Sequence, residues 1–571
     1  MFRQTNHHRG YVALSSHPTG NGESHHATPH GGTLSVHPDG TSYTYAYGPK
    51  GLAGLRHNSY ALGCAIFASI GGLTFGYDQG VIANILVMKE FVARFPVTSW
   101  EKGLMTAMLE LGSLVGALTA GVLADRYSRR QSILVACVVF CIGSALQCAA
   151  QSIPQLIVGR AIGGLGVGAL SMLSPLYMAE ISPPEVRGSL MALEQFSIVL
   201  GAVLGFWTGY FTRDLPGSIS WRSPLAIQII PGLLLGFGSF FLPPSPRLLV
   251  SHGRDDEALQ SLAKLRLRAP EEANTDPLLQ MELLEMRVEA QLVEKTFGYS
   301  TKDGTFVAEA RAWKQLFSKK YINRTFIGIV MMFFQQWSGI NALLYYGPTL
   351  MHEIGLQGDT VTLLVSGGIG IVQFLAVFPT IIYIDSLGRK PLLRWGSAIM
   401  CLSHLTISLL VRQYESDWPA HVTAAWTAVV CVYIFTAAYG MSYGPIGWIL
   451  PSEVFPQSVR SKGVSLATAS NWSNNFLIGL VTPVMMETSP SFTFVIFALA
   501  CFAGYFWSTY VVPETANVSL EEIDAVFGSS AGQEDALLKQ EIEEEIGLRR
   551  LIADLAEGPF TTTTTRDDLE H

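Results

Sequence analysis

An acidic residue, Asp78, lies within a long apolar stretch that runs from about residue 60 to residue 87. A carboxylate at membrane depth costs at least a few kcal/mol, so such a group usually faces a water-filled cavity or a charged partner. A second costly charge, Arg160, lies within another apolar stretch, 154–180. Pairing of Asp78 with Arg160 would offset part of both desolvation costs. An intramembrane acid makes transport the first hypothesis for this chain.

Amide and indole side chains recur in the other apolar stretches. Amides supply neutral donors and acceptors, and indoles supply flat apolar faces, a combination that suits a polyhydroxy solute. The candidates are Gln195, Gln335, Gln336, Asn341, Asn471 and Asn475, with Trp448 and Trp472. Gln335 and Asn341 are about 120° apart on an ideal helix, so both face one cavity only if Gly339 distorts the segment. For any single amide, the alternative is a hydrogen bond between helices, and for Trp472 it is core packing.

The composition indicates a polytopic membrane protein. The chain has 571 residues, 49% of them hydrophobic and 14% charged, with a mean hydropathy of +0.31. A soluble chain carries about a quarter charged residues. Runs of roughly twenty apolar residues recur, each long enough to cross a bilayer. Twelve spans are predicted, at about 60–87, 103–124, 131–151, 154–180, 189–211, 223–243, 322–350, 360–384, 391–413, 422–450, 463–486 and 490–512.

Basic residues gather in the loops that share a side with the two termini, which predicts that both termini are cytoplasmic. The predicted divisions are a disordered N-terminal tail (1–59), a first bundle (60–243), a helical linker (244–321), a second bundle (322–512) and a C-terminal tail (513–571). A Glu-rich helix near 533–557 in the last of these is expected to be solvated. No motif for a nucleophile, metal, cofactor or nucleotide stands out, so we predict neither an enzyme nor a nucleic-acid partner.

Two charge patterns occur twice. Asp125 to Arg130 follows the second span as Asp385 to Lys390 follows the eighth, and an acid precedes an arginine by seven residues after both the fourth and the tenth spans. A duplicated six-span unit is typical of transporters with a site between the halves. Charge pairs at cytoplasmic helix ends can form a gate that exchanges partners on opening; ordinary positive-inside charge is the alternative. Besides Arg129, the gate is predicted to contain Asp125, Arg126, Arg130, Glu180, Arg187, Asp385, Arg389, Glu453 and Arg460.

An ordered set of motifs makes the chain resemble the sugar porter family of the major facilitator superfamily. The motifs are Gly121-x3-Asp125-Arg126-x2-Arg129-Arg130, Gly159-Arg160, Pro175 with Glu180 to Gly188, Pro243 to Arg247, Gln335-Gln336 with Gly339-Ile340-Asn341, Gly444-Pro445 with Trp448, and Pro513-Glu514-Thr515. Ser128 and Pro244 depart from the family pattern, and Pro244 puts one cytoplasmic ion pair in doubt.

The resemblance implies an all-α membrane fold with twelve transmembrane helices in two six-helix bundles. It implies a monosaccharide carrier, with a hexose as the expected solute, that works by alternating access and proton symport. Asp78 would accept the proton, and Arg160 would tune the pKa of Asp78. The sugar site would be lined by Gln195, Gln335, Gln336, Asn341 and Trp448. Phe334, Tyr345 and Tyr346 would close that site on the outside. We expect a monomer in the cell membrane, in contact with lipid.

Three alternatives stay open. The pair of Asp78 and Arg160 could be a static ion pair in a facilitator that moves sugar without a proton. Glu110, in the second span, is a rival proton site. A non-transporting sugar sensor is the alternative of another class, although such sensors carry a much longer signalling tail than the one after Val512.

Overall fold

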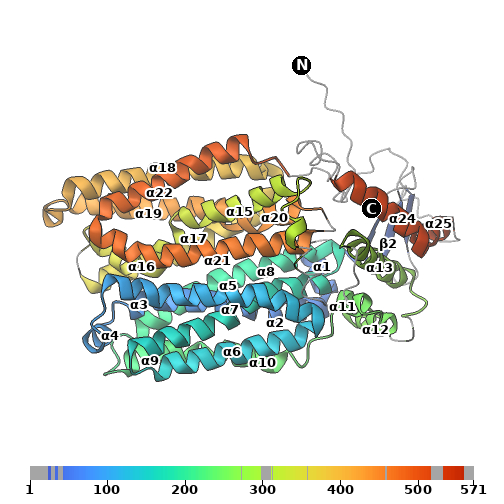
Figure 1. The fold of residues 1–571 in the computed structure, drawn as a ribbon, viewed down its shortest axis with the longest axis horizontal. Coiled ribbons are helices and arrows are strands. Elements are labelled where there is room, and N and C mark those ends of the chain that lie inside the picture. The colour runs from blue at the N-terminus through green and yellow to red at the C-terminus, as the bar shows by residue number, and fades with distance from the viewer. Residues whose placement is uncertain are drawn as a thin grey trace, which may run out of the picture.

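The computed structural model describes residues 24–27, 32–36, 43–49, 51–269, 271, 273–297, 310, 313–356, 358–456, 459–515 and 531–557. A long bundle of nearly parallel and antiparallel helices makes up most of the molecule (Figure 1). A smaller group of strands and short helices lies at one end of the bundle, on the right in that view. The two halves of the chain lie side by side along the bundle.

The first half of the bundle contains six helical spans. They are α2 (Ser59–Ala68) continued by α3 (Ile70–Ile85), then α5 (Ser99–Arg126), α6 (Arg129–Ala149), α7 (Ile153–Ile181), α8 (Arg187–Thr212), and α9 (Ile219–Ile227) continued by α10 (Ile229–Gly238). The short helices α1 (Gly51–His57), α4 (Lys89–Arg94) and η1 (Pro184–Val186) lie between or before them.

The second half repeats this order. Its spans are α15 (Ile322–Trp337) continued by α16 (Ile340–Glu353), then α17 (Asp359–Leu387), α18 (Arg389–Tyr414), α19 (Val422–Met441) continued by α20 (Tyr443–Val454), α21 (Arg460–Thr488) and α22 (Pro490–Tyr510). A short turn of helix, η3 (Trp418–Ala420), precedes α19. The predicted all-α membrane fold is confirmed, and the described helices follow the predicted order of six segments in each half.

Ten helices among the described residues are long and apolar enough to cross a membrane. The other two predicted spans are α9 with α10, which carries Arg222 and Gln228, and α21, which carries Asn471 and Asn475. These polar side chains lower the hydropathy of both segments. In α21 the amides face the interior of the bundle, where helices tolerate polar groups that lipid would not.

The two halves meet along three pairs of helices: α5 with α21, α3 with α16, and α8 with α17. Gly103 shows how close the contact is, because a Cβ atom there would lie 2.3 Å from the carbonyl oxygen of Leu480. Small residues let membrane helices approach to backbone contact. Four of the elements that carry candidate site residues, α3, α5, α16 and α21, therefore lie at the contact between the halves.

The strands β1 (Ser24–Ala27), β2 (Thr33–Val36) and β3 (Tyr43–Ala46) form one antiparallel sheet in that order. We call this sheet, α11 (Pro246–Ser251), α12 (Asp255–Leu265), α13 (Pro277–Phe297), α24 (Ala531–Ile546) and α25 (Leu548–Glu557) the tail–linker domain. Its buried core combines the N-terminal tail, the linker and the C-terminal tail, for example Leu34 and Tyr47 with Leu262 and Ile552. Three segments far apart in sequence thus share one core.

The predicted disorder of residues 1–59 is wrong for the part that forms this sheet and for α1. Tyr43 and Tyr45 each donate a hydrogen bond of 2.7 Å to Glu285 on α13. Tyr47 donates one of 2.8 Å to Glu282 on the same helix. The tail has few apolar residues, so its composition predicts disorder. The tail is ordered by its contacts with Glu282 and Glu285, which lie more than 230 residues away in the sequence. Local composition does not reveal such contacts.

The helix predicted near 533–557 is confirmed as α24 and α25, but its expected solvation is wrong for one face. Ile542, Leu548 and Ile552 are buried in the core of the tail–linker domain. Glu545 of α24 accepts a hydrogen bond of 2.8 Å from Lys295 of α13. The apolar face of the two helices thus packs on the linker, while charged residues lie at the margin.

Acidification is expected to release the N-terminal tail from the linker. Burial alone would raise the pKa of the Glu282 carboxyl, but Arg266 at 2.5 Å and the Tyr47 hydroxyl hold that pKa below its usual range. An acid with a lowered folded pKa stabilises the fold above its unfolded pKa, roughly 4.3, and this contribution is lost as the pH falls through the folded value. Limited proteolysis of the tail across this range measures the release.

Tyr47→Phe is expected to raise the pH at which cleavage of the tail begins, because it removes a buried hydrogen bond to a charged group worth about 1.5–3 kcal/mol. Tyr510→Phe, at a position 78% exposed at the end of α22, is the matched control. Equal cleavage of Tyr47→Phe and the unmodified protein at every pH would contradict the role given to this contact.

Candidate functional site

Asp78 and Arg160 form an ion pair inside the first half. Arg160 on α7 donates a hydrogen bond of 3.0 Å to Oδ1 of Asp78 on α3, and their side chains are 1% and 0% exposed. The predicted pairing is confirmed. Oδ2 of Asp78 and Nε and Nη2 of Arg160 have no hydrogen-bond partner among the described residues. A buried ion pair with open hydrogen-bonding positions is sensitive to any water or hydroxyl that reaches it.

The amides of the second half bond to one another across the break between α15 and α16. Gln335 donates a hydrogen bond of 3.0 Å to the carbonyl oxygen of Tyr443. It accepts one of 2.6 Å from Asn471 of α21. Asn341 donates to Gln336 at 2.5 Å and to Asn475 of α21 at 2.9 Å. All five amides predicted in this half therefore bond to another amide, in two groups: Gln335 with Asn471, and Asn341 with both Gln336 and Asn475.

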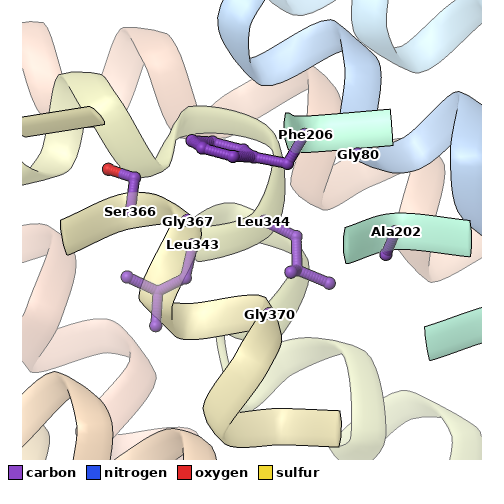
Figure 2. Close-up of a pocket in the computed structure, with 8 residues that line it drawn as sticks. All are labelled: Gly80, Ala202, Phe206, Leu343, Leu344, Ser366, Gly367 and Gly370. Atoms are coloured by element: carbon purple, nitrogen blue, oxygen red, sulfur yellow. The ribbon is translucent and has the colours of Figure 1, made fainter. Parts of the chain in front are cut away.

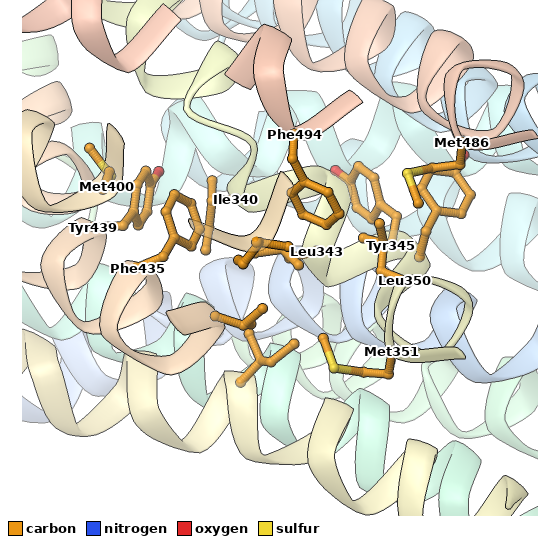
Figure 3. Close-up of a cluster of buried hydrophobic side chains, with 14 of the residues drawn as sticks. Ile340, Leu343, Tyr345, Leu350, Met351, Met400, Phe435, Tyr439, Met486 and Phe494 are labelled. Atoms are coloured by element: carbon orange, nitrogen blue, oxygen red, sulfur yellow. The ribbon is translucent and has the colours of Figure 1, made fainter. Parts of the chain in front are cut away.

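Gly339 makes this meeting geometrically possible. Its φ angle is +95°, in the left-handed region that glycine adopts at no steric cost, and it separates α15 from α16. The distortion that Gln335 and Asn341 require is therefore present at the predicted residue. The apolar side of α16 packs into a cluster with Met400, Phe435 and Phe494 (Figure 3). That packing fixes the direction of the helix after the break.

A second network joins the two halves. Gln79, the neighbour of Asp78, donates a hydrogen bond of 2.8 Å to the hydroxyl of Tyr345 on α16. Tyr345 in turn donates a hydrogen bond of 2.7 Å to one carboxyl oxygen of Glu110 on α5. Asn475 donates one of 3.0 Å to the other oxygen of Glu110. Sequence reasoning assigned no role to Gln79, and Tyr345 was expected only to close the site. An amide beside an intramembrane acid is the signal that would have pointed to Gln79.

The remaining predicted site residues take no part in these hydrogen bonds among the described residues. Gln195 on α8 and Trp448 on α20 are half-buried and make no hydrogen bond to the described residues. Trp472 is fully buried, with its ring centre 5.0 Å from that of Phe75 in the other half. Phe334 packs against Trp507 of α22, with ring centres 5.3 Å apart, and its expected place at the outer closure stays a prediction.

The side chains of the networks are buried, with Glu110, Gln335 and Tyr345 at most 1% exposed. The pocket in Figure 2 lies where α3 and α8 meet α16 and α17, and it has a volume of about 10 Å³. A space of this size holds about one water molecule. Its lining consists of Gly80, Ala202, Phe206, Leu343, Leu344, Ser366, Gly367 and Gly370. In this conformation the buried amides satisfy one another.

The repeated charge patterns form one equivalent ion pair in each half. Arg129 of α6 contacts Glu180 of α7 at 2.9 Å, and Arg389 of α18 contacts Glu453 of α20 at 2.6 Å. Each pair lies within a single half, so these two contacts do not hold the halves together as the gate prediction assumed. Arg130 donates a hydrogen bond of 3.0 Å to the carbonyl oxygen of Leu242. Among the neighbouring arginines, packing selects Arg129 as the partner of Glu180.

The other predicted gate residues also behave alike in the two halves. Arg187 and Arg460 each donate to a carbonyl oxygen five residues earlier, at 3.5 and 3.3 Å. Glu514 accepts hydrogen bonds from the backbone N–H groups of Arg389 and Lys390 at 2.9 and 3.1 Å, which caps the start of α18. The side chains of Asp125, Arg126 and Asp385 lie outside the described residues.

Two six-span halves with duplicated charge patterns, a buried ion pair and facing amides define a major facilitator carrier for a polar solute. The family model for sugar (and other) transporters matches residues 64–527, so the chain belongs to this family, the sugar porters of the major facilitator superfamily. The protein is accordingly a multi-pass membrane sugar transporter.

Relatives of this chain with similar sequences are also named as transporters. The chain is 32% identical over 470 residues to an MFS-type transporter of Aspergillus cristatus, covering 82% of this chain and 94% of the relative. It is 32% identical over 482 residues to a low-affinity glucose transporter of Saccharomyces cerevisiae, covering 81% of each chain.

Solved structures of the xylose transporter XylE from E. coli have the same fold. One, a partially occluded inward-open conformation, gives a TM-score of 0.66 at 25% identity and covers 81% of this chain and 100% of that chain. Another, XylE as a proton:xylose symporter bound to 6-bromo-6-deoxy-D-glucose, gives 0.65 at 27% identity and covers 82% of this chain and 99% of that chain.

Proposed function

We propose that this transporter carries a hexose together with a proton by alternating access. The observation that carries the proposal is the fully buried pair of Asp78 and Arg160, one residue away from Gln79, which bonds to Tyr345 in the other half. Proton binding to Asp78 would weaken its hold on Arg160. The freed guanidinium would then change the contacts around Gln79, which couples proton binding to the arrangement of the two halves.

For the sugar, we propose the amides of Gln335, Gln336, Asn341, Asn471 and Asn475 as the hydrogen-bonding groups, with Gln195, Trp448 and Trp472 completing the site after the halves separate. Neutral amides suit a neutral solute, because each hydroxyl can both donate and accept. Apart from Arg160, the described residues of this network include no basic side chain, which disfavours a sugar acid. The glucose transporter among the relatives supports a hexose.

We also propose that the protein is a monomer in the cell membrane with the tail–linker domain and both termini in the cytoplasm. The basic loops support this orientation. Under the same proposal, the charged helix ends near Arg129, Glu180, Arg389 and Glu453 form the cytoplasmic gate region, each pair bracing its own half. Protease added outside intact cells should leave tags on both termini uncut, and light scattering of the purified protein should give the mass of one chain.

Proteoliposomes containing the purified protein test the proposal. With a labelled sugar panel and an imposed pH gradient, the unmodified protein should accumulate hexose above the equilibrium level, and dissipation of the gradient should abolish this. Asp78→Asn should still exchange labelled for unlabelled sugar but should no longer accumulate it, because the amide binds no proton. Accumulation by Asp78→Asn would remove Asp78 from the proton pathway.

A facilitator without proton coupling is the second candidate. It is favoured by the name of the yeast relative, which mentions glucose but no proton. In that case the unmodified protein would equilibrate hexose at the same rate with and without the pH gradient and would never accumulate it. The same experiment therefore separates the two functions.

A further inference from the structure

Glu110 is a buried acid that the proposed role of Asp78 leaves unused. It lies on α5 in the first half, is 0% exposed, and directs both carboxyl oxygens at the second half. Oε1 lies 2.7 Å from the hydroxyl of Tyr345, and Oε2 lies 3.0 Å from the amide nitrogen of Asn475. The carboxyl group thus bridges the two halves, whereas Asp78 and Arg160 both belong to the first.

Counting hydrogens around Tyr345 shows room for one more proton. Its hydroxyl accepts a hydrogen bond from Gln79 at 2.8 Å and lies close to two oxygen acceptors, Glu110 Oε1 at 2.7 Å and Asn475 Oδ1 at 3.1 Å. A phenol has a single hydrogen, so beside an ionised Glu110 only one of these two contacts can be a hydrogen bond. A proton on Glu110 Oε1 completes both: Glu110 donates to Tyr345, and Tyr345 donates to Asn475.

The balance of charges around Glu110 also favours a protonated carboxyl group. The titratable and charged groups that face Glu110 are Asp78 on α3, Arg160 on α7, and the phenols of Tyr345 and Tyr346 on α16. Asp78 and Arg160 compensate each other in their ion pair. An ionised Glu110 would therefore leave one uncompensated negative charge in a fully buried place, which is costly. A neutral Glu110 removes that charge.

We propose that Glu110 binds a proton from water when the two halves close on each other and returns it to water when they separate. Closure itself then takes up a proton beside Asn475, one of the amides proposed to bind sugar. The inference rests on the proposed sugar carriage, and it adds a proton site to the one at Asp78.

Counterflow of labelled D-glucose in proteoliposomes tests this site, because exchange requires repeated closure but no net proton movement. At equal pH on both sides, the rate of the unmodified protein should fall at alkaline pH, approaching tenfold per pH unit for one titrating group. Glu110→Gln should lose this fall, since its amide donates to Tyr345 at every pH. Glu90→Gln, at an exposed acid on α4, is the control and should keep the fall.

Two further measurements keep the test decisive if Glu110→Gln exchanges sugar poorly or D-glucose is not carried. Tyr345→Phe removes the acceptor for the proton of Glu110, so the alkaline fall should move to lower pH. Infrared spectra of the purified protein in its closed form should show a protonated carboxylic acid band that Glu110→Gln lacks, without any sugar. An unchanged pH profile in Glu110→Gln, or an unchanged band, overturns the inference. Failure of the unmodified protein to accumulate hexose would overturn the symport proposal alone.

Discussion

Arg160→Gln is expected to abolish proton-driven accumulation of hexose. The substitution leaves the carboxylate of Asp78 buried without the cationic contact that Arg160 makes at 3.0 Å in the intact protein. Breaking a buried pair by removing one partner costs about 3–5 kcal/mol. Asp78 avoids that cost by keeping a proton, and at 1.36 kcal/mol per tenfold step this favours the protonated form by roughly 10²–10⁴-fold. A group that never releases its proton cannot couple the gradient to the sugar.

The measurement is the accumulation ratio in proteoliposomes under an imposed pH gradient, beside the rate of sugar exchange. Accumulation should fall to the equilibrium level, while exchange continues. The double variant Asp78→Asn with Arg160→Gln removes both charges, so its thermal stability should exceed that of Arg160→Gln, yet it should still fail to accumulate. Undiminished accumulation by Arg160→Gln would show that the pair is a static structural contact.

Gly339→Val is expected to produce the largest loss of sugar binding among substitutions outside the polar network. A β-branched residue at a φ of +95° costs of order 1–3 kcal/mol in backbone strain. A Cβ atom would also lie 2.9 Å from the ring of Phe497, and overpacking of this kind costs about 1–3 kcal/mol. Relief of both requires α15 and α16 to rotate relative to each other. Gln335 and Asn341 would then no longer face the same region.

Gly358→Ala provides the matched control for backbone strain alone. Gly358 has a φ of +89°, but no atom lies within 4 Å of the position its Cβ would occupy. This variant should lose about 1 kcal/mol of stability from the left-handed backbone and retain its affinity for sugar. Binding of labelled hexose and thermal unfolding of both variants check the prediction. Equal sugar affinity in Gly339→Val and the unmodified protein would show that the break does not align the amides.

The sequence by itself determined the bundle and its duplication. Long apolar runs can only be satisfied as membrane helices, because lipid offers no hydrogen bonds to the backbone. The pairing of Asp78 with Arg160 was predictable for the same reason, since each charge is too costly alone in an apolar segment. The break at Gly339 followed from the angular mismatch between Gln335 and Asn341. These inferences need only local composition, periodicity and the cost of burial.

Only the tertiary structure decided which neighbouring side chain makes each contact. Adjacent residues on a helix point about 100° apart, so the choice of Arg129 over Arg130 depends on how α6 packs against α7. Gln79, Tyr345 and Glu110 are brought together only when the two halves meet. The N-terminal sheet forms because Glu282 and Glu285 lie beside it in the folded chain. Contacts between segments hundreds of residues apart depend on the relative placement of whole elements, which local patterns do not encode.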